Sequence, residues 1–177
     1  MLKRPNRSIF RTEDVTGGLP VKEIYIQSVL LIERLHRRFL DVVKAELDRL
    51  RIDDINNVQT LILYNISGEQ LTIGELTNRG YYLGSNVSYN VKKLVENGYL
   101  IQSPAPHDRR STRIRLSDKA KVLCERIDEL YSRSVDLLQR SGIQETTLQQ
   151  INRQLSDLER FWTEQVNVIY KLAASVR

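Results

Sequence analysis

The stretch LTIGELTNRGYYLGSNVSYNVKKLVENGYLI, from Leu71 to Ile101, decides the fold. Thr72 and Glu75 have the T-x-x-E spacing of a capping box, in which the two side chains bond reciprocally to the first backbone N–H groups of a helix. This pattern predicts a short helix over residues 73–80. The glycine at its end suits the left-handed conformation in which helices commonly terminate.

A second helix is expected after the turn that contains Gly84. Ser85 is its predicted N-cap, and Gly98 is predicted to end it. Apolar residues recur at helical spacing along one side, namely Val87, Val91, Leu94 and Val95. Two short helices joined by a tight turn predict a helix-turn-helix.

The opposite face of this helix is polar and basic. Any amphipathic helix has a polar face, so the pattern alone is compatible with simple solvation. Here, however, Asn, Ser and Tyr come first and two lysines follow, which suits a helix whose N-terminal end enters a DNA major groove. The residues predicted to contact DNA are Ser85, Asn86, Ser88, Tyr89, Lys92 and Lys93.

Two strands with a basic connection are expected next, over residues 99–103 and 112–116. A two-stranded ribbon directly behind a helix-turn-helix indicates a winged helix. Arg109 and Arg110 lie at its tip, where an arginine can reach a narrow minor groove. Asp108 is expected to orient Arg110. Arg113 is expected on the outer face of the returning strand, facing solvent or a phosphate.

Long helices are predicted on both sides of this region. The first covers residues 20–50, and Asp53 or Asp54 is the expected N-cap of another over residues 55–66. After the wing, helices are expected over 117–141 and 145–175. The last has an apolar stripe at alternating steps of three and four. It could pack within the chain, but a small winged helix offers little surface for so long a stripe, so self-association is the preferred interpretation.

These elements predict a mainly α fold with a small β-wing, in which long N- and C-terminal dimerisation helices flank the winged helix-turn-helix. The expected organisation is a flexible basic tail over residues 1–19, a dimerisation helix over 20–52, a DNA-binding domain over 53–117 and a helical dimerisation region over 118–177. Residues 1 to 11 carry a net charge of +4, out of +5 for the 177-residue chain. The tail is either a solvated terminus or an arm that touches phosphate or a partner subunit.

Composition excludes several classes of protein. The single cysteine, Cys124, excludes an internal disulfide, and a redox role for it is disfavoured because no nearby cation lies on its helix face. His36 and His107 are far apart in sequence, so no metal site or cofactor is expected. No apolar run is long enough for a signal core or a membrane span, which predicts a cytoplasmic protein.

The segments GSNVSYNVKKLVENGYL and HDRRSTRIRLS resemble those of the multiple antibiotic resistance regulator (MarR) family of bacterial transcription factors. The wing motif of the family has an Asp, an Arg two residues later, and then a Leu followed by Thr or Ser. Asp108, Arg110, Leu116 and Ser117 match it. The order of the helices and strands also matches over about residues 20 to 175. Tyr89 and Asn90 depart from the family pattern, so the base preference does not follow from the resemblance.

The resemblance implies a homodimer with interlocked terminal helices on a pseudo-palindromic operator. Recognition helices would lie in successive major grooves and wings in the flanking minor grooves. It also implies control by a small phenolic or aromatic effector, for which His36 and Phe39 could border a pocket with the second helix. Core packing for Phe39 and solvation for His36 are the alternatives.

The leading hypothesis is therefore a sequence-specific regulator of transcription that binds double-stranded DNA as a homodimer, with repression under ligand control. A winged helix that serves as a protein-interaction module, with its terminal coiled coil gripping a partner, is the alternative. Its polar recognition face would need no positive charge, and the lysines and arginines count against it. No nucleophile with a nearby base, carboxylate pair or phosphate loop suggests an enzyme.

Overall fold

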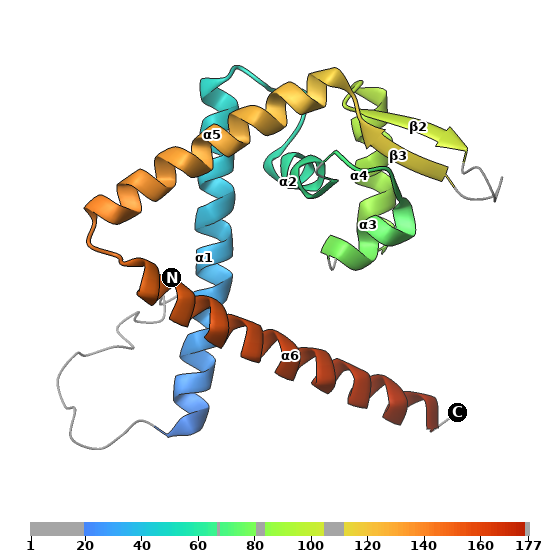
Figure 1. Cartoon of the computed structure of the whole chain (residues 1–177). Helices are drawn as coiled ribbons and strands as arrows, with labels where there is room; N and C mark the ends of the chain where they lie inside the picture. The colour runs from blue at the N-terminus through green and yellow to red at the C-terminus, as the bar shows by residue number, and fades with distance from the viewer. Residues whose placement is uncertain (1–19, 67, 81–83, 105–111, 176–177) are drawn as a thin grey trace, which may run out of the picture. The chain divides into compact units, whose positions relative to one another are not determined.

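The computed structural model describes residues 20–66, 68–80, 84–104 and 112–175 (Figure 1). It is mainly α-helical with one small sheet, as the sequence predicted. In chain order the elements are α1 (Val21–Arg49), α2 (Asn57–Ile66), β1 (Leu71–Thr72), α3 (Ile73–Gly80), α4 (Gly84–Glu96), β2 (Leu100–Pro104), β3 (Thr112–Leu116), α5 (Asp118–Arg140) and α6 (Glu145–Ser175). The chain forms two compact units, Met1–Val58 and Gln59–Arg177. The predicted tail over 1–19 lies outside the described residues.

The first unit consists of α1 and the turn that follows it. Asn57, the first residue of α2, is tied to α1 because its Nδ2 donates to the carbonyl oxygen of Leu40 at 3.0 Å. The prediction that Asp53 or Asp54 caps this helix is wrong. The helix begins at Asn57, so both aspartates lie in the turn before it.

In the second unit, α2 is buried on several sides. Its buried residues are Gln59, Thr60, Ile62, Leu63 and Ile66, and Leu61 is half-buried. One of its neighbours is α5: the Tyr64 ring meets the Tyr131 ring edge-on at 5.1 Å, and its hydroxyl donates to Asp128 Oδ1 at 3.1 Å. A helix with contacts on several sides does not show a single apolar stripe.

The capping box forms at the start of α3, as predicted. The N–H of Thr72 donates to Glu75 Oε2 at 2.6 Å, and the N–H of Glu75 donates to Thr72 Oγ1 at 3.1 Å. These bonds satisfy two N–H groups that a helix start would otherwise leave unpaired. They fix where α3 begins, at Ile73.

A glycine in the left-handed conformation ends α4, also as predicted. Gly98 has a φ of +75°, the N–H of Tyr99 donates to the carbonyl oxygen of Leu94 at 2.8 Å, and that of Gly98 to the carbonyl oxygen of Val95 at 3.0 Å. This is a Schellman motif. At the other end, α4 begins at Gly84, so Ser85 lies inside the helix and the prediction that it is the N-cap is wrong.

The wing belongs to a three-stranded antiparallel sheet in the order β1-β3-β2. Strand β3 has the predicted bounds, and β2 begins one residue later than expected. The sequence analysis missed β1, which pairs Leu71 with Ile114 and Thr72 with Arg113. Ile114 and Leu116 are buried, while Arg115 on the other face is exposed.

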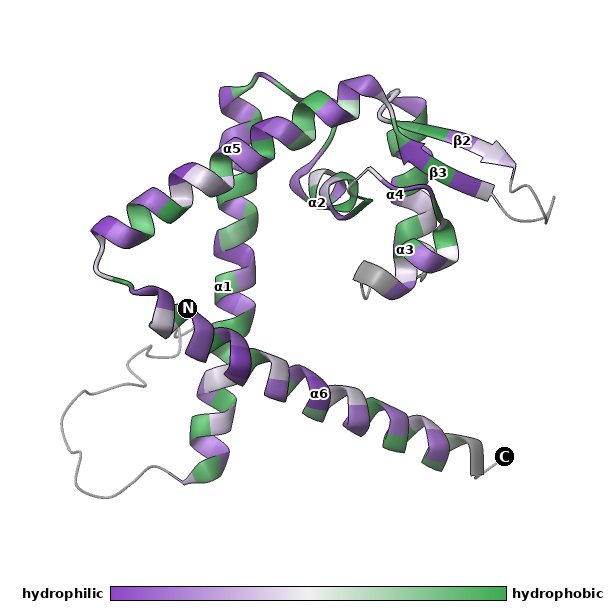
Figure 2. Cartoon of the chain, viewed as in Figure 1, coloured by the Kyte–Doolittle hydropathy of each residue, from purple (hydrophilic) through white to green (hydrophobic). Residues whose placement is uncertain are grey.

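The long helices expose much of their apolar surface. Ser117, where the sequence predicted this helix to start, caps α5: its Oγ accepts from the N–H of Ala120 at 3.2 Å. Along α6 no side chain from 145 to 173 is buried. Hydrophobic residues alternate with polar ones along this helix (Figure 2). Apolar residues of α1 and α6 that are exposed include Ile24, Leu30, Leu31, Leu35, Ile151, Leu155, Val166, Ile169 and Leu172.

Gly98→Ala should destabilise the protein by about 1 kcal/mol, because a Cβ disfavours the left-handed backbone. The space around Gly98 is open, so no clash adds to this cost. Gly74→Ala is the matched control: a Cβ there meets only Thr72 Oγ1 at 3.9 Å, and helical Gly74 should gain up to about 0.5 kcal/mol. Urea unfolding at one protein concentration measures both. A neutral Gly98→Ala would contradict the assignment of this helix end.

Candidate nucleic-acid interface

The polar side of α4 is open to solvent above a buried apolar side. Val87, Val91 and Leu94 are at most 1% exposed, which fixes the rotation of the helix about its axis. Asn86, Ser88, Tyr89 and Lys92 are exposed, and Lys93 is half-buried. Of the six predicted contact residues on this helix, these five therefore share an accessible surface. The side chain of Ser85 lies outside the described residues.

Tyr89 is the most prominent apolar group of this surface, with 62% of its area exposed. It stands between the buried Val87 and Val91 in sequence and on the other side of the helix. Its neighbour Asn90 is turned back onto the helix, since its Nδ2 donates to the carbonyl oxygen of Asn86 at 2.8 Å. Tyr89 and Asn86 are thus better placed than Asn90 to contact a base edge.

Both lysines of α4 lie next to one carboxylate. Lys93 Nζ is 2.8 Å from Glu96 Oε2, and Lys92 Nζ is 3.9 Å from Glu96 Oε1. The hydrogen bond to Glu96 raises the pKa of Lys93, and the same bond lowers the pKa of Glu96. Lys93 is therefore cationic at neutral pH. Glu96 therefore offsets part of the positive charge predicted for this face. The ion pairs could have been predicted from the sequence, because Glu96 follows Lys93 by three positions and Lys92 by four.

The tip of the wing, with Asp108, Arg109 and Arg110, lies outside the described residues. Arg113 is described, in the central strand between Thr72 and Ser103. It is half-buried, and its Nε is buried without a hydrogen-bond partner among the residues that the structure describes. Arg113 is therefore less open to solvent than Arg115 on the same face of β3, which is exposed.

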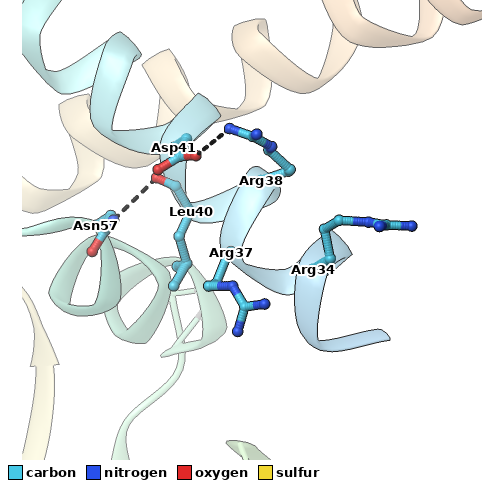
Figure 3. A pocket seen from close by; sticks show the side chains of 6 residues that line it. All are labelled: Arg34, Arg37, Arg38, Leu40, Asp41 and Asn57. Carbon is cyan, nitrogen blue, oxygen red and sulfur yellow. Dashed lines mark hydrogen bonds and ion pairs between the residues drawn. The ribbon is translucent and has the colours of Figure 1, made fainter. Parts of the chain in front are cut away.

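An open cavity of about 530 Å³ lies beside α1 in the first unit (Figure 3). It is lined by Arg34, Arg37, Arg38, Leu40, Asp41 and Asn57. Arg37 is 3.4 Å from Glu33 and Arg38 is 3.4 Å from Asp41, while Arg34 makes no ion pair or hydrogen bond within the described chain. Figure 3 shows the guanidinium groups of Arg34 and Arg37 pointing apart, so each can receive a carboxylate or another small anion singly.

The residues predicted to border an effector pocket, His36 and Phe39, do not line this cavity. Both are on α1 and exposed, Phe39 to 38%. They lie on a different part of the helix surface from the arginines. The pocket at His36 and Phe39 stays a prediction.

Cys124 on α5 is a half-buried thiol. Burial, and to a lesser extent the charge of Glu125, raises its pKa to about 11. The reactive thiolate is therefore scarce at neutral pH, which agrees with the expectation that a redox role is disfavoured.

Within the described ranges no group of His, Cys, Asp or Glu side chains could hold a metal ion. No described helix has the length and apolar character needed to cross a membrane.

Comparison with known families assigns the central part of the chain. Residues 55–120 match the winged helix DNA-binding domain family. This range runs from the turn before α2 to the first turn of α5, so it contains the helix-turn-helix, the sheet and the Ser117 cap.

Two curated proteins are similar in sequence. The exopolysaccharide II synthesis transcriptional activator ExpG of Rhizobium meliloti (strain 1021) is 41% identical over 100 residues, which cover 56% of this chain and 52% of ExpG. The match thus spans about half the length of that relative. The HTH-type transcriptional repressor IacR of Pseudomonas putida is 27% identical over 126 residues, 70% of this chain and 72% of IacR. Both are named as regulators of transcription, not as enzymes.

The solved structures show the same fold. A mutant of MarR from E. coli complexed with operator DNA superposes with a TM-score of 0.65 at 17% identity, covering 79% of this chain and 99% of that chain. The sequence motifs in α4 and the wing, the matched domain and the fold agree. Residues 55–120 are therefore assigned to the winged helix DNA-binding domains, and the chain shares the fold of MarR.

Proposed function

We propose that this protein is a homodimeric regulator of transcription that binds double-stranded DNA of defined sequence. The observation that carries the proposal is the surface of α4. Its apolar side is fully buried by Val87, Val91 and Leu94, and its other side presents Asn86, Tyr89 and Lys92 to solvent. A helix held in this way, second in a helix-turn-helix, has the shape and the groups that enter a major groove.

Each exposed group of α4 has a distinct role in this proposal. Asn86, near the N-terminal end, can bond adenine through its amide, and Ser88 can bond a base or a phosphate. Lys92 and Lys93 supply charge to the phosphate backbone, which gives affinity without sequence preference. Arg110, with Arg109, would reach the minor groove from the wing tip, and Asp108 would orient Arg110. Arg113 would contact only the backbone, because it is half-buried.

The exposed apolar faces of α1 and α6 support self-association. Ile151, Leu155, Ile169 and Leu172 of α6 are 45%, 42%, 60% and 62% exposed in the single chain. The step of four from Ile151 to Leu155 and the step of three from Ile169 to Leu172 are typical of helices that pack on a partner helix. A homodimer with two-fold symmetry would read a pseudo-palindromic operator, with half-sites about one helical turn apart.

The direction of regulation is proposed as repression. The relatives are named as an activator and as a repressor, so their names do not decide it. Covering a promoter needs no contact with the transcription machinery, whereas activation does.

A ligand can release DNA only if it binds better to the protein in a state whose two DNA-binding lobes are wrongly spaced. The effector proposed from the resemblance is a small aromatic compound, with His36 and Phe39 at its site. The cavity beside Arg34 suits the carboxylate of such a compound.

Isothermal titration calorimetry with benzoate distinguishes the cavity beside Arg34 from the predicted pocket at His36 and Phe39. Arg34→Gln should lower the benzoate affinity about tenfold if the carboxylate lies in the cavity. Phe39→Ala should lower it if the ring lies at the predicted pocket. An unchanged affinity in both variants, or no binding to the wild-type protein, would contradict an effector of this class on α1.

The salt dependence of DNA affinity distinguishes a DNA-binding protein from the alternative function, a protein-interaction module. The affinity of the wild-type protein for duplex DNA should fall steeply with salt, with a slope set by the number of phosphates contacted. Arg110→Ala should weaken binding by about 1–3 kcal/mol. Fluorescence anisotropy at several salt concentrations measures both. A flat salt dependence, or no loss in Arg110→Ala, would favour the protein-interaction module.

Glu96→Gln should act in the opposite direction in the same assay. Loss of the carboxylate frees Lys92 and Lys93 for phosphates, so DNA affinity should rise and the salt slope should steepen by up to about one charge. Glu129→Gln is a matched control, because this residue pairs with Arg126 at 2.8 Å on α5, away from the recognition helix. A weaker complex with Glu96→Gln would show that these lysines do not face phosphates.

Leu155→Asp should dissociate the dimer, because a carboxylate would have to be buried in the helix interface. Gln154→Asp adds the same charge at the neighbouring exposed position and should leave the dimer intact. Sedimentation equilibrium distinguishes the two species by mass. A monomeric wild-type protein, or equal effects of the two variants, would contradict dimerisation through this face of α6.

A further inference from the structure

The recognition helix is joined to α5 by bonds that follow directly after its end. Three consecutive carbonyl oxygens, those of Asn97, Gly98 and Tyr99, all accept hydrogen bonds from the start of α5. Lys119 Nζ donates to the first at 3.2 Å, Ser117 Oγ to the second at 2.7 Å, and the N–H of Ser117 to the third at 3.0 Å. These residues, 97–99 with Ser117 and Lys119, are called the α4–α5 junction below.

The hydroxyl of Ser117 makes hydrogen bonds at the end of α4 and at the start of α5. It donates to the carbonyl oxygen of Gly98 and accepts from the N–H of Ala120, so the group that caps α5 also holds the end of α4. Ser117 is buried, at 9% exposure, where a lost hydrogen bond is not replaced by water without cost. One side chain therefore sets the position of the α4 end against the start of α5.

Lys119 adds a second connection that the sequence pattern did not reveal. Its ammonium group lies 4.0 Å from the centre of the Tyr99 ring, and Tyr99 is only 2% exposed. The same ammonium group bonds the Asn97 carbonyl, close to the negative end of the α4 dipole. Its charge thus interacts with the end of the recognition helix as well as with the aromatic residue that follows it.

We propose that Ser117 and Lys119 are positioning residues that fix the orientation of α4 relative to α5, and thereby the approach of the α4 polar face to base edges. The inference rests on the proposed function of α4 in reading DNA. It assigns specificity to residues at the end of α4 opposite to Asn86.

The fold does not depend on the junction alone. The residues that follow Tyr99 are also held to those that precede Ser117, because β2 pairs with β3 from Leu100 with Leu116 to Pro104 with Thr112. The buried side of α4 supplies a separate set of contacts. Removal of the Ser117 hydroxyl should therefore leave a folded protein whose α4 is less sharply oriented.

The test uses Ser117→Ala, with Ser117→Thr as the conservative rescue because it keeps the hydroxyl. The probes are the duplex that the wild-type protein selects from a random pool and a scrambled duplex of equal length and composition. Ser117→Ala should lose about tenfold in affinity for the selected duplex and stay within about twofold for the scrambled one. Ser117→Thr should stay within about twofold of wild type on both.

Lys119→Gln tests the second positioning residue, and Lys121→Gln is its matched control. Lys121 lies two residues further along α5 and pairs with Asp118 at 2.8 Å, so the same charge is lost without touching the junction. Selectivity between the two duplexes should fall in Lys119→Gln and remain in Lys121→Gln. Equal losses in the two variants would mean that Lys119 acts only through its charge, which overturns its positioning role.

Hydrogen exchange without DNA gives a readout that does not depend on DNA recognition. The amides of Gly98 and Tyr99 should exchange about tenfold faster in Ser117→Ala, because the end of α4 is released. Unchanged exchange, or equal loss of affinity for both duplexes, overturns the junction. If the wild-type protein selects no sequence, the proposed function fails, and the exchange rates still decide whether Ser117 holds α4.

Discussion

Burial of one side of α4 is the constraint on which the rest of the structure depends. Val87, Val91 and Leu94 have no more than 1% of their surface in water, so any rotation of the helix would expose an apolar side chain or bury a lysine. The capping box of α3 and the left-handed Gly98 set the two ends of the helix-turn-helix around this contact. The polar groups of α4 are presented at one surface because the apolar groups are held on the other.

Local signals in the sequence were sufficient for much of this arrangement. The capping box, the glycine at the end of α4, the Ser117 cap and the bounds of β3 and α6 all involve residues within a few positions of one another. The exposed residues of α4 followed from the period of the helix. These features depend on backbone geometry that short sequence patterns report directly.

The sequence did not predict features that depend on distant partners. Strand β1 has only two residues, and only its pairing with β3 makes it a strand. The helix α2 starts at Asn57, whose side chain donates to the carbonyl oxygen of Leu40, 17 positions earlier. Local patterns pointed instead to Asp53 or Asp54 as the cap. The contacts of Ser117 and Lys119 with residues 97–99 also join segments about 20 positions apart, so a pattern that identified the cap could not identify its second bond.

The structure thus combines three features: a helix that presents polar groups, a junction that holds the end of this helix, and long helices with exposed apolar faces. The most direct test of the central claim is methylation protection of guanine N7 on a DNA duplex selected by the wild-type protein. Two protected major-groove clusters about one helical turn apart are expected, one for each α4 of a dimer. Complete methylation of every guanine in a bound duplex rich in guanine would contradict it, because α4 would then not lie in the major groove.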